Sequence, residues 1–195
     1  MLGFAKRIFV GALFSALLFF SLPSTSQAKT PAAPPSLDAL ARELQTPELL
    51  EKYMRKNFLY VEDRALFGQE EYWQTAEEIA FRKKGDCEDF ATFAQAILKR
   101  NGYQTFLVSV YWELDAHTVV VFEREGNWGL FNLDQLSYLK RGSLKEIGDR
   151  IQNNWSYLGL MRREGRLGLI SRKFWAHRLG KTDLSFLTPK SVSAG

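Results

Sequence analysis

The sequence predicts an α+β fold in which one helix packs on an antiparallel meander of three strands. After Asp86, apolar side chains recur at helical spacing, at Phe90, Phe93, Ala94, Ile97 and Leu98. Three β-branched and aromatic runs follow, separated by short polar connections: Thr105 to Leu114, His117 to Arg124 and Trp128 to Leu136. A helix followed by neighbouring strands is the α+β plan. The length of 195 residues, with 46% hydrophobic content, suits one globular domain.

The first 28 residues have the features of a signal peptide. Lys6 and Arg7 form a basic start, and the uncharged run from Ile8 to Leu22 is too short to span a bilayer. Ser26-Gln27-Ala28 places small side chains at both positions that a signal peptidase reads. We therefore predict export to the periplasm or the medium. Removing these 28 of the 195 residues leaves 167 with a net charge of +2 instead of +4, which argues against nucleic acid as a partner.

The segment from Lys29 to Ser36 is a proline-rich spacer, so the folded domain is expected to begin near Leu37. Thr46-Pro47-Glu48 has the form of an N-cap, a first-turn proline and a first-turn acid, which predicts a helix. Thr75 to Glu78 is a capping box that starts a short helix ending by Gly85.

Neighbouring residues also predict the end of one helix and the start of another. The helix after Asp86 is expected to end at Lys99 to Gly102, a basic last turn followed by a glycine cap. Ser143 to Glu146 is another capping box and predicts a helix that runs to about Gln152.

A basic segment occupies residues 161–195. Between Met161 and Lys181 it holds seven Lys or Arg residues against Glu164 alone. One interpretation is a solvated face packed by Phe174 and Trp175. The other is an amphipathic helix or hairpin that binds an anionic lipid or cell-wall polymer, which makes an anionic envelope surface a candidate partner.

The chain has one cysteine and two histidines, which excludes a disulfide framework and a multi-site zinc protein. Cys87 falls in the first turn of the helix after Asp86, where free N–H groups and the helix dipole favour a thiolate and can hold an oxyanion. The neighbouring acids Asp86, Glu88 and Asp89 oppose ionisation of the thiol. The alternative interpretation is that Cys87 is a small buried residue on the apolar face.

Of the two histidines, His117 is the one for which the sequence predicts a carboxylate partner. If Glu125-Gly126 is a two-residue hairpin loop, facing residues of the two strands have numbers that add to 251, and His117 faces Asp134. A loop at Gly126-Asn127 would instead place Leu136 opposite His117. His177 has no carboxylate at a useful spacing and is assigned to the basic surface.

Three motifs, GDCEDFA at 85–91, DAHTVVVF at 115–122 and FNLDQL at 131–136, resemble the transglutaminase-like superfamily, and within it the bacterial transglutaminase-like cysteine proteinases. The resemblance covers about Trp73 to Tyr138 and implies a papain-like core within a domain at 37–160. It implies Cys87 as nucleophile, His117 as general base and then acid, and Asp134 as the residue that orients His117. Those proteinases have Asp followed by Asn in the third motif, whereas here Asn132 precedes Asp134 by two residues.

The second oxyanion donor and a calcium site are two further roles for which the sequence offers candidates. The backbone N–H of Cys87 is one oxyanion donor, and Gln74 or Trp73 is a candidate for the second, with packing under the helix as the alternative for Trp73. Some of the resembling proteinases are calcium-dependent, and Asp86, Glu88 and Asp89 carry hard oxygen ligands, although capping the helix is their alternative role. No other cofactor is expected.

We expect an exported thiol enzyme that acts on a protein or peptide. Cys87 attacks a peptide or side-chain amide, and a thioester forms and is resolved. Hydrolysis is favoured over transamidation because transamidation requires a site that excludes water. The alternative is a catalytically silent transglutaminase-like module that binds protein or cell-envelope polymer through the basic segment.

Overall fold

Among the described residues, most helices lie before residue 101 and most strands lie after it. The computed structural model describes residues 36–140, 142–161 and 167–172. The first elements are α1 (Leu37–Glu43), α2 (Pro47–Asn57), β1 (Leu59–Tyr60), α3 (Asp63–Phe67), α4 (Ala76–Arg82), β2 (Lys84–Gly85) and the longest helix, α5 (Cys87–Arg100). They are followed by β3 (Gln104–Trp112), β4 (Asp115–Arg124), β5 (Asn127–Asn132), β6 (Gln135–Tyr138), α6 (Leu144–Ile151), β7 (Tyr157–Met161) and β8 (Leu167–Ser171).

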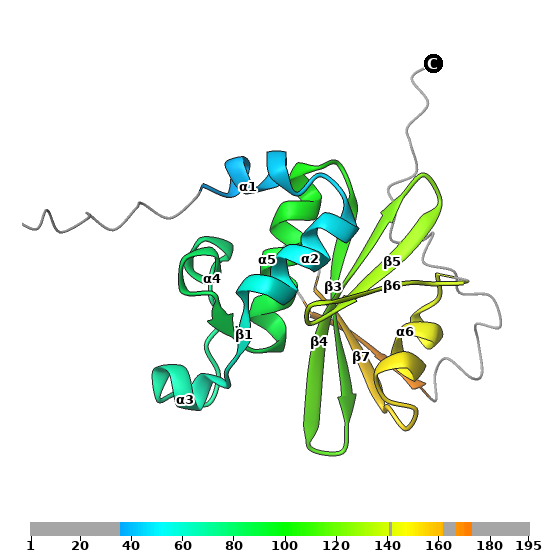
Figure 1. The fold of residues 1–195 in the computed structure, drawn as a ribbon. Helices are drawn as coiled ribbons and strands as arrows, with labels where there is room; N and C mark the ends of the chain where they lie inside the picture. Colours follow the sequence, from blue (N-terminus) through cyan, green and yellow to red (C-terminus); the bar gives the residue numbers. More distant parts are fainter. Residues whose placement is uncertain (1–35, 141, 162–166, 173–195) are drawn as a thin grey trace, which may run out of the picture. The chain divides into compact units, whose positions relative to one another are not determined.

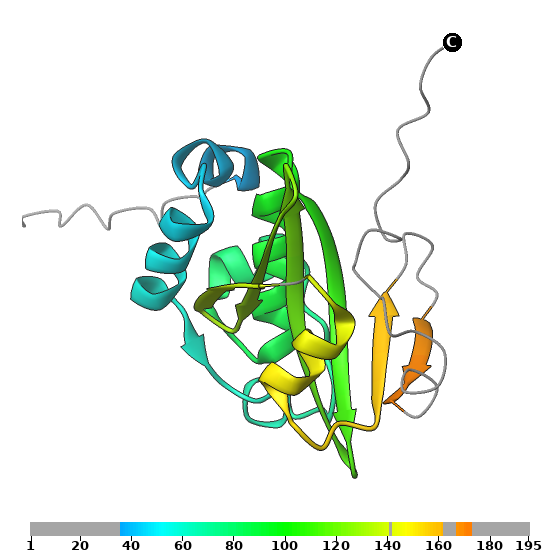
Figure 2. The ribbon, with the colours of Figure 1, turned by 90° about the vertical axis from the view of Figure 1, so that its right-hand side faces the viewer.

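The strands form a six-stranded antiparallel sheet in the order β6-β5-β4-β3-β7-β8. The predicted meander is its centre, and the α+β prediction is confirmed. Figure 2 shows β7 and β8, drawn in orange, beyond β3. A separate pair of two-residue strands, β1 and β2, runs parallel just before α5.

Apolar side chains alternate along the strands and create a core on each face of the sheet. On one face, Val120 and Phe122 of β4 belong to a core cluster that also contains buried side chains of α1, α2, α4 and α5, and α5 is the helix that lies against β4. On the other face, Val119 and Val121 pack against α6 and Trp155. Figure 1 shows the helices from blue to green on one side of the strands and α6, in yellow, on the other. Each large buried side chain contributes about 1.5–3 kcal/mol.

Local capping fixes the helix starts where the sequence predicts them. The hydroxyl groups of Thr46, Thr75 and Ser143 accept hydrogen bonds from backbone N–H groups in the first turns of α2, α4 and α6. At Thr75 the full capping box is present, because Glu78 accepts from the backbone of Thr75. Helix α5 differs: its N-cap, Asp86, makes no side-chain capping hydrogen bond, so its first turn keeps N–H groups for other partners.

The β4–β5 hairpin has the predicted loop. Glu125 and Gly126 both have positive φ, 54° and 82°, as a type I′ turn requires, and Arg124 pairs with Asn127. However, the pairing of β4 with β5 stops at Val120 and Phe131. The prediction of one strand from Trp128 to Leu136 is wrong, because a turn at residues 133–134 divides this run into β5 and β6.

Three predicted segments lie wholly or mainly outside the described residues. They are the signal peptide at 1–28, the proline-rich spacer at 29–36 apart from Ser36, and most of the basic segment at 161–195, including His177. The described part of the basic segment includes β8, which pairs with β7. No helix among the described residues is long and apolar enough to cross a membrane.

Candidate active site

The thiol of Cys87 lies between the first turn of α5 and the start of β4. Cys87 is the first residue of α5, and its Sγ accepts a hydrogen bond from the N–H of Thr118 at 3.4 Å. The thiol itself donates to Oε2 of Glu88 at 3.2 Å. The fold therefore places the predicted nucleophile beside the residue that follows His117.

The surroundings of Cys87 keep its thiol protonated in this conformation. Burial raises its pKa to about 12, and the charges of Glu88 and Asp86 add to the increase, while the N–H of Thr118 opposes it. The predicted activation by the helix N-terminus is thus outweighed. The thiol hydrogen bond to Glu88 is consistent with a proton on sulfur.

The ring of His117 is held by Asn132. Nε2 of His117 and Oδ1 of Asn132 are 2.7 Å apart. An amide oxygen can only accept, so Nε2 is the donor in this contact, and the tautomer that makes this hydrogen bond has its lone pair on Nδ1. An imidazole fixed through one nitrogen, with the other free to accept a proton, is the arrangement that a general base requires.

The predicted pairing of His117 with Asp134 is not observed. β5 ends at Asn132, and Leu133 adopts φ 53°, which starts the turn into β6. Asp134 lies in this turn, where its backbone oxygen accepts a hydrogen bond from Nε of Arg55 at 3.3 Å. The sum of 251 also places Asn132 opposite Val119, diagonal to His117 and on the same face, which is the signal that identifies Asn132.

Neither predicted second oxyanion donor is free. Gln74 is buried, and its backbone N–H and Nε2 donate to the carboxylate of Asp89 at 2.8 and 2.6 Å, while Nε2 also donates to the oxygen of Lys84. The indole N–H of Trp73 donates to Glu71 at 2.8 Å. Gly85 leaves room for this network, since a Cβ there would lie 2.7 Å from Nε2 of Gln74. Gln74 is therefore a structural support for Asp89 beneath the first turn of α5.

Five acidic residues gather around the first turn of α5. Asp86, Glu88 and Asp89 are the three that the sequence indicates, and the structure adds Asp63 from α3 and Glu71 from the following loop. Oxygen atoms of Asp63, Asp86 and Asp89 lie within 4.8 Å of one another, as do those of Asp63, Glu71 and Glu88. The sequence does not indicate Asp63 and Glu71 as members of this cluster. They lie outside the GDCEDFA motif, and only tertiary packing brings them to α5.

Burial and mutual repulsion disfavour the ionised form of the carboxyl groups in this cluster. Burial raises the pKa of Asp63 and of Asp89. Burial, the hydrogen bond with Glu88 and the neighbouring carboxylates raise the pKa of Asp86 to about 8. Burial and the charge of Glu71 raise the pKa of Glu88, and the hydrogen bond with Asp86 opposes this rise. Oδ1 of Asp63, Oδ1 of Asp86 and Oε1 of Glu88 are buried and have no hydrogen-bond partner. Asp63 and Glu88 are only 2% and 4% exposed, so these oxygens lack compensation from solvent.

Tyr60 is a half-exposed neighbour of the thiol that the sequence does not single out. It pairs with Gly85 through the parallel β1–β2 ladder, two residues before Cys87. Burial raises its pKa to about 12, and its electrostatic interactions with the ionisable groups of Cys87, Asp86, Glu62 and Glu88 add to the rise, so its hydroxyl keeps its proton at neutral pH.

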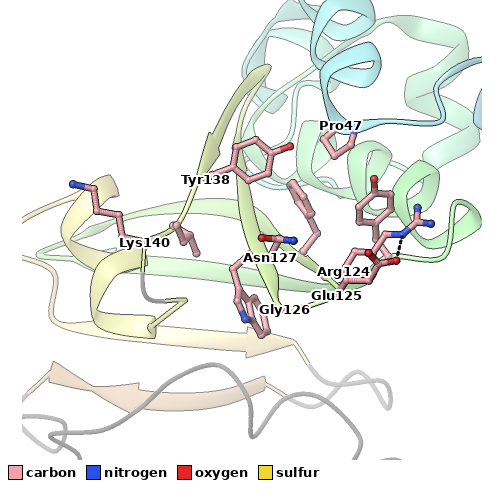
Figure 3. A pocket seen from close by; sticks show the side chains of 11 residues that line it. Pro47, Arg124, Glu125, Gly126, Asn127, Tyr138 and Lys140 are labelled. Carbon is pink, nitrogen blue, oxygen red and sulfur yellow. Dashed lines mark ion pairs between the residues drawn. The ribbon is translucent and has the colours of Figure 1, made fainter.

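A pocket of about 530 Å³ lies at the other end of β4. Its lining includes Tyr103, Phe122, Arg124, Trp128 and Tyr138, and Figure 3 shows the ion pair of Arg124 with Glu125 at its rim. Arg124 is seven residue steps along β4 from His117, which corresponds to roughly 23 Å. The pocket shares no residue with the thiol site.

Comparison with known proteins gives distant structural similarities. No curated protein matches the chain. Calcium-bound LapG of Legionella pneumophila is 19% identical over 82% of this chain and 80% of its own, with a TM-score of 0.46. A putative cysteine protease of Cytophaga hutchinsonii is 16% identical over 70% of this chain and half of its own, with a TM-score of 0.42. The periplasmic domain of TgpA from Pseudomonas aeruginosa is 15% identical over 69% of this chain and 42% of its own, with a TM-score of 0.26.

A family match covers the site itself. The model of the family DUF553, the transglutaminase-like domain, matches residues 39–148. This range is more than half of the 195 residues and includes Cys87, His117 and Asn132. The chain therefore belongs to the transglutaminase-like domain family.

Proposed function

We propose that this chain is an exported cysteine peptidase or amidohydrolase with Cys87 as its nucleophile. The observation that carries the proposal is the position of Sγ, which lies at the first turn of α5 and accepts from the N–H next to His117. The contact of His117 with Asn132 supports a Cys87, His117, Asn132 triad in place of the triad with Asp134. The substrate class is a protein or peptide.

The first half of the proposed reaction forms a thioester. The thiol turns from Glu88 toward His117, and Nδ1 of His117 takes its proton as sulfur attacks the amide carbonyl carbon. The oxyanion that forms accepts a hydrogen bond from the uncapped N–H of Cys87. When the C–N bond breaks, His117 returns the proton to the leaving amine.

The second half releases the acyl product. His117 removes a proton from water, the hydroxide attacks the thioester carbonyl, and the C–S bond breaks to give a free carboxylate and Cys87. Asn132 keeps the ring of His117 oriented through both halves. An amine in place of water would give transamidation, and hydrolysis is proposed because no feature of the described site excludes water.

A cleavage assay tests the proposal. The full chain, Cys87→Ala and Cys87→Ser are incubated with an unstructured protein, in calcium and in EGTA, and the products are identified by mass spectrometry. We expect new carboxyl termini with the natural chain and none with either variant. Incorporation of an added amine instead of water identifies a transferase. Equal results for all three proteins contradict an enzyme and support the silent module that binds protein or envelope polymer.

The residues present fit a calcium ion at the acidic cluster. Calcium takes six to eight oxygen ligands, and the buried, unpartnered oxygens of Asp63, Asp86 and Glu88 are suited to hold a cation, with Asp89 and Glu71 beside them. Calcium-bound LapG agrees with this proposal. The ion would neutralise the carboxylates around Cys87. No residue outside this cluster is proposed as a ligand.

Thermal unfolding in calcium and in EGTA tests the site without relying on activity. At about 100 times its Kd, calcium would stabilise the fold by about 2.7 kcal/mol, which is a rise in Tm of roughly 5–10 °C for a chain of this size. Asp63→Asn should remove the calcium-dependent rise, whereas Glu77→Gln, an exposed acid on α4, should keep it. An equal rise with magnesium, or none with calcium, contradicts the assignment.

Export is proposed from residues 1–28, and secretion of a fusion of these residues to a reporter enzyme tests it. We expect the reporter outside the cytoplasm and shortened after Ala28. Retention of an uncut reporter inside the cell contradicts export. The proposed binding of an anionic envelope surface by residues 161–195 is tested separately by a vesicle or cell-wall pull-down with and without that segment.

A further inference from the structure

The turn between β5 and β6 follows directly after Asn132, the residue that holds the ring of His117. Asn132 pairs with Gln135, so Leu133 and Asp134 form a two-residue loop. Leu133 has φ 53°, a left-handed value that a leucine side chain disfavours. A residue in such a conformation keeps it only where the surrounding structure holds it. The position of Asn132 therefore depends on what anchors this turn.

Two side chains of α2 supply such an anchor. Nε of Arg55 donates a hydrogen bond to the backbone oxygen of Asp134 at 3.3 Å. Oε1 of Glu51 accepts a hydrogen bond from the N–H of Leu136 at 3.0 Å. The two side chains are themselves joined by an ion pair of 3.0 Å between Oε1 of Glu51 and Nη2 of Arg55. Helix α2 lies against β6 (Figure 1), so this one ion pair contacts the backbone on both sides of Gln135, the first residue of β6.

The hydrogen bond to Leu136 uses a backbone group that the sheet does not pair. β6 is the outermost strand of the described sheet, and β5 is its one strand partner there. N–H groups alternate in direction along a strand, and the N–H of Leu136 is directed to Glu51 on α2. The side chains of Leu133 and Leu136 meanwhile pack against the core cluster on the helical face. Apolar packing thus holds the side chains of the turn, while Glu51 and Arg55 hold its backbone.

We propose that Glu51 and Arg55 are positioning residues of the active site. They hold the β5–β6 turn, through which Asn132 keeps the ring of His117 oriented. This inference rests on the proposed function and adds two residues that act through Asn132 and not on the substrate. It also gives Asp134 of the third motif a role, since its backbone oxygen accepts from Arg55. An exposed ion pair adds little to stability, and the Arg55 side chain is 55% exposed. Loss of this pair should therefore disturb the orientation of His117 more than the fold.

Steady-state kinetics of the full chain test this role. With a peptide that the natural chain cleaves, Glu51→Ala should lower kcat roughly tenfold, the scale of one lost hydrogen bond to a charged group, with little change in KM. Glu51→Gln keeps an oxygen that accepts from Leu136 and should recover most of this loss. Arg55→Ala, at a more exposed position, repeats the test if Glu51→Ala does not fold. Glu43→Ala, at an exposed acid on α1, is the matched control and should have the natural kcat. A kcat in both α2 variants equal to that of Glu43→Ala overturns the inference.

A double-mutant cycle separates positioning from a general loss of stability. If Glu51 acts through Asn132, the loss of kcat in Asn132→Ala already contains the loss in Glu51→Ala. The double variant should then have the kcat of Asn132→Ala alone, measured at a temperature where circular dichroism shows every variant to be folded. Independent effects would instead multiply the two losses, and that result overturns the inference.

A measurement that needs no turnover keeps the inference testable if the proposed chemistry fails. The Nε2–H proton of His117 is observed by NMR in the isotope-labelled full chain and is assigned by its absence in His117→Gln. The hydrogen bond to Asn132 slows exchange of this proton with water, so Asn132→Ala should remove its signal. Glu51→Ala and Arg55→Ala should broaden or remove the signal, and Glu43→Ala should not. An unchanged signal in both α2 variants overturns the inference. A signal that is lost in these variants of a chain that cleaves no peptide contradicts the proposed function alone.

Discussion

At the level of single residues, the imidazole of His117 is held by an amide where a carboxylate is the expected partner. Nε2 lies 2.7 Å from Oδ1 of Asn132. An amide orients the ring through one hydrogen bond but brings no negative charge to stabilise an imidazolium ion. The acids of this site instead surround the thiol, where Glu88 accepts from Sγ. Orientation of the base and charge at the nucleophile are thus supplied by different parts of the chain.

Substitution of Asn132 tests which residue orients the base. Asn132→Ala should lower kcat about 10²-fold with little change in KM, because the ring loses its fixed orientation in the transition state. Asn132→Asp should retain most of the activity, since a carboxylate oxygen accepts the same hydrogen bond. Asp134→Ala serves as the matched variant, and its kcat should stay close to that of the natural chain. A larger loss in Asp134→Ala than in Asn132→Ala would instead support the pairing predicted from the motif.

At the level of elements, local signals predict the helices well, and the central hairpin follows from its turn. Capping residues mark the starts of α2, α4 and α6 correctly. The division of the last predicted strand has no such marker. Leu133 adopts φ 53° without a glycine, a conformation that its side chain disfavours, so nothing in the sequence predicts a turn there. This one turn decides between Asp134 and Asn132. Asp63 and Glu71 were also beyond prediction, because tertiary packing brings them to α5.

The Glu125-Gly126 turn offers a test of the hairpin. Glu125 holds φ 54°, where asparagine is better tolerated, and its ion pair with Arg124 is long, at 3.7 Å, and exposed. Glu125→Asn should therefore raise the free energy of unfolding by about 0.5 kcal/mol. Glu125→Ala removes the same ion pair without improving the turn and should give no gain. Urea unfolding of the three proteins measures the difference, and an equal gain in both variants would show that the ion pair, and not the turn, is responsible.

At the level of the whole molecule, α2 and the β5–β6 end of the sheet are joined by polar contacts. The hydroxyl of Tyr138 on β6 donates to Glu48 on α2, and Glu51 accepts from the N–H of Leu136 at 3.0 Å. Arg55 donates to the oxygen of Asp134 in the same region. These contacts fix the turn that places Asn132 beside His117. The helical layer therefore acts on the site through the β5–β6 turn as well as through α5.

The contact between Glu48 and Tyr138 predicts a pH-dependent contribution to stability. The hydrogen bond from Tyr138 lowers the pKa of Glu48 below its ordinary value of 4.5, with burial opposing. A carboxyl group whose pKa is lowered by folding stabilises the fold above that ordinary value, and the contribution is lost as the pH falls through the lowered pKa. Tyr138→Phe should thus lower the urea midpoint at about pH 7 and differ less from the natural chain at about pH 3. Tyr157→Phe, at a similarly exposed tyrosine, should show no such convergence. A difference for Tyr138→Phe that stays constant between the two pH values would show that lost packing, and not the hydrogen bond to the ionised carboxylate, accounts for the effect.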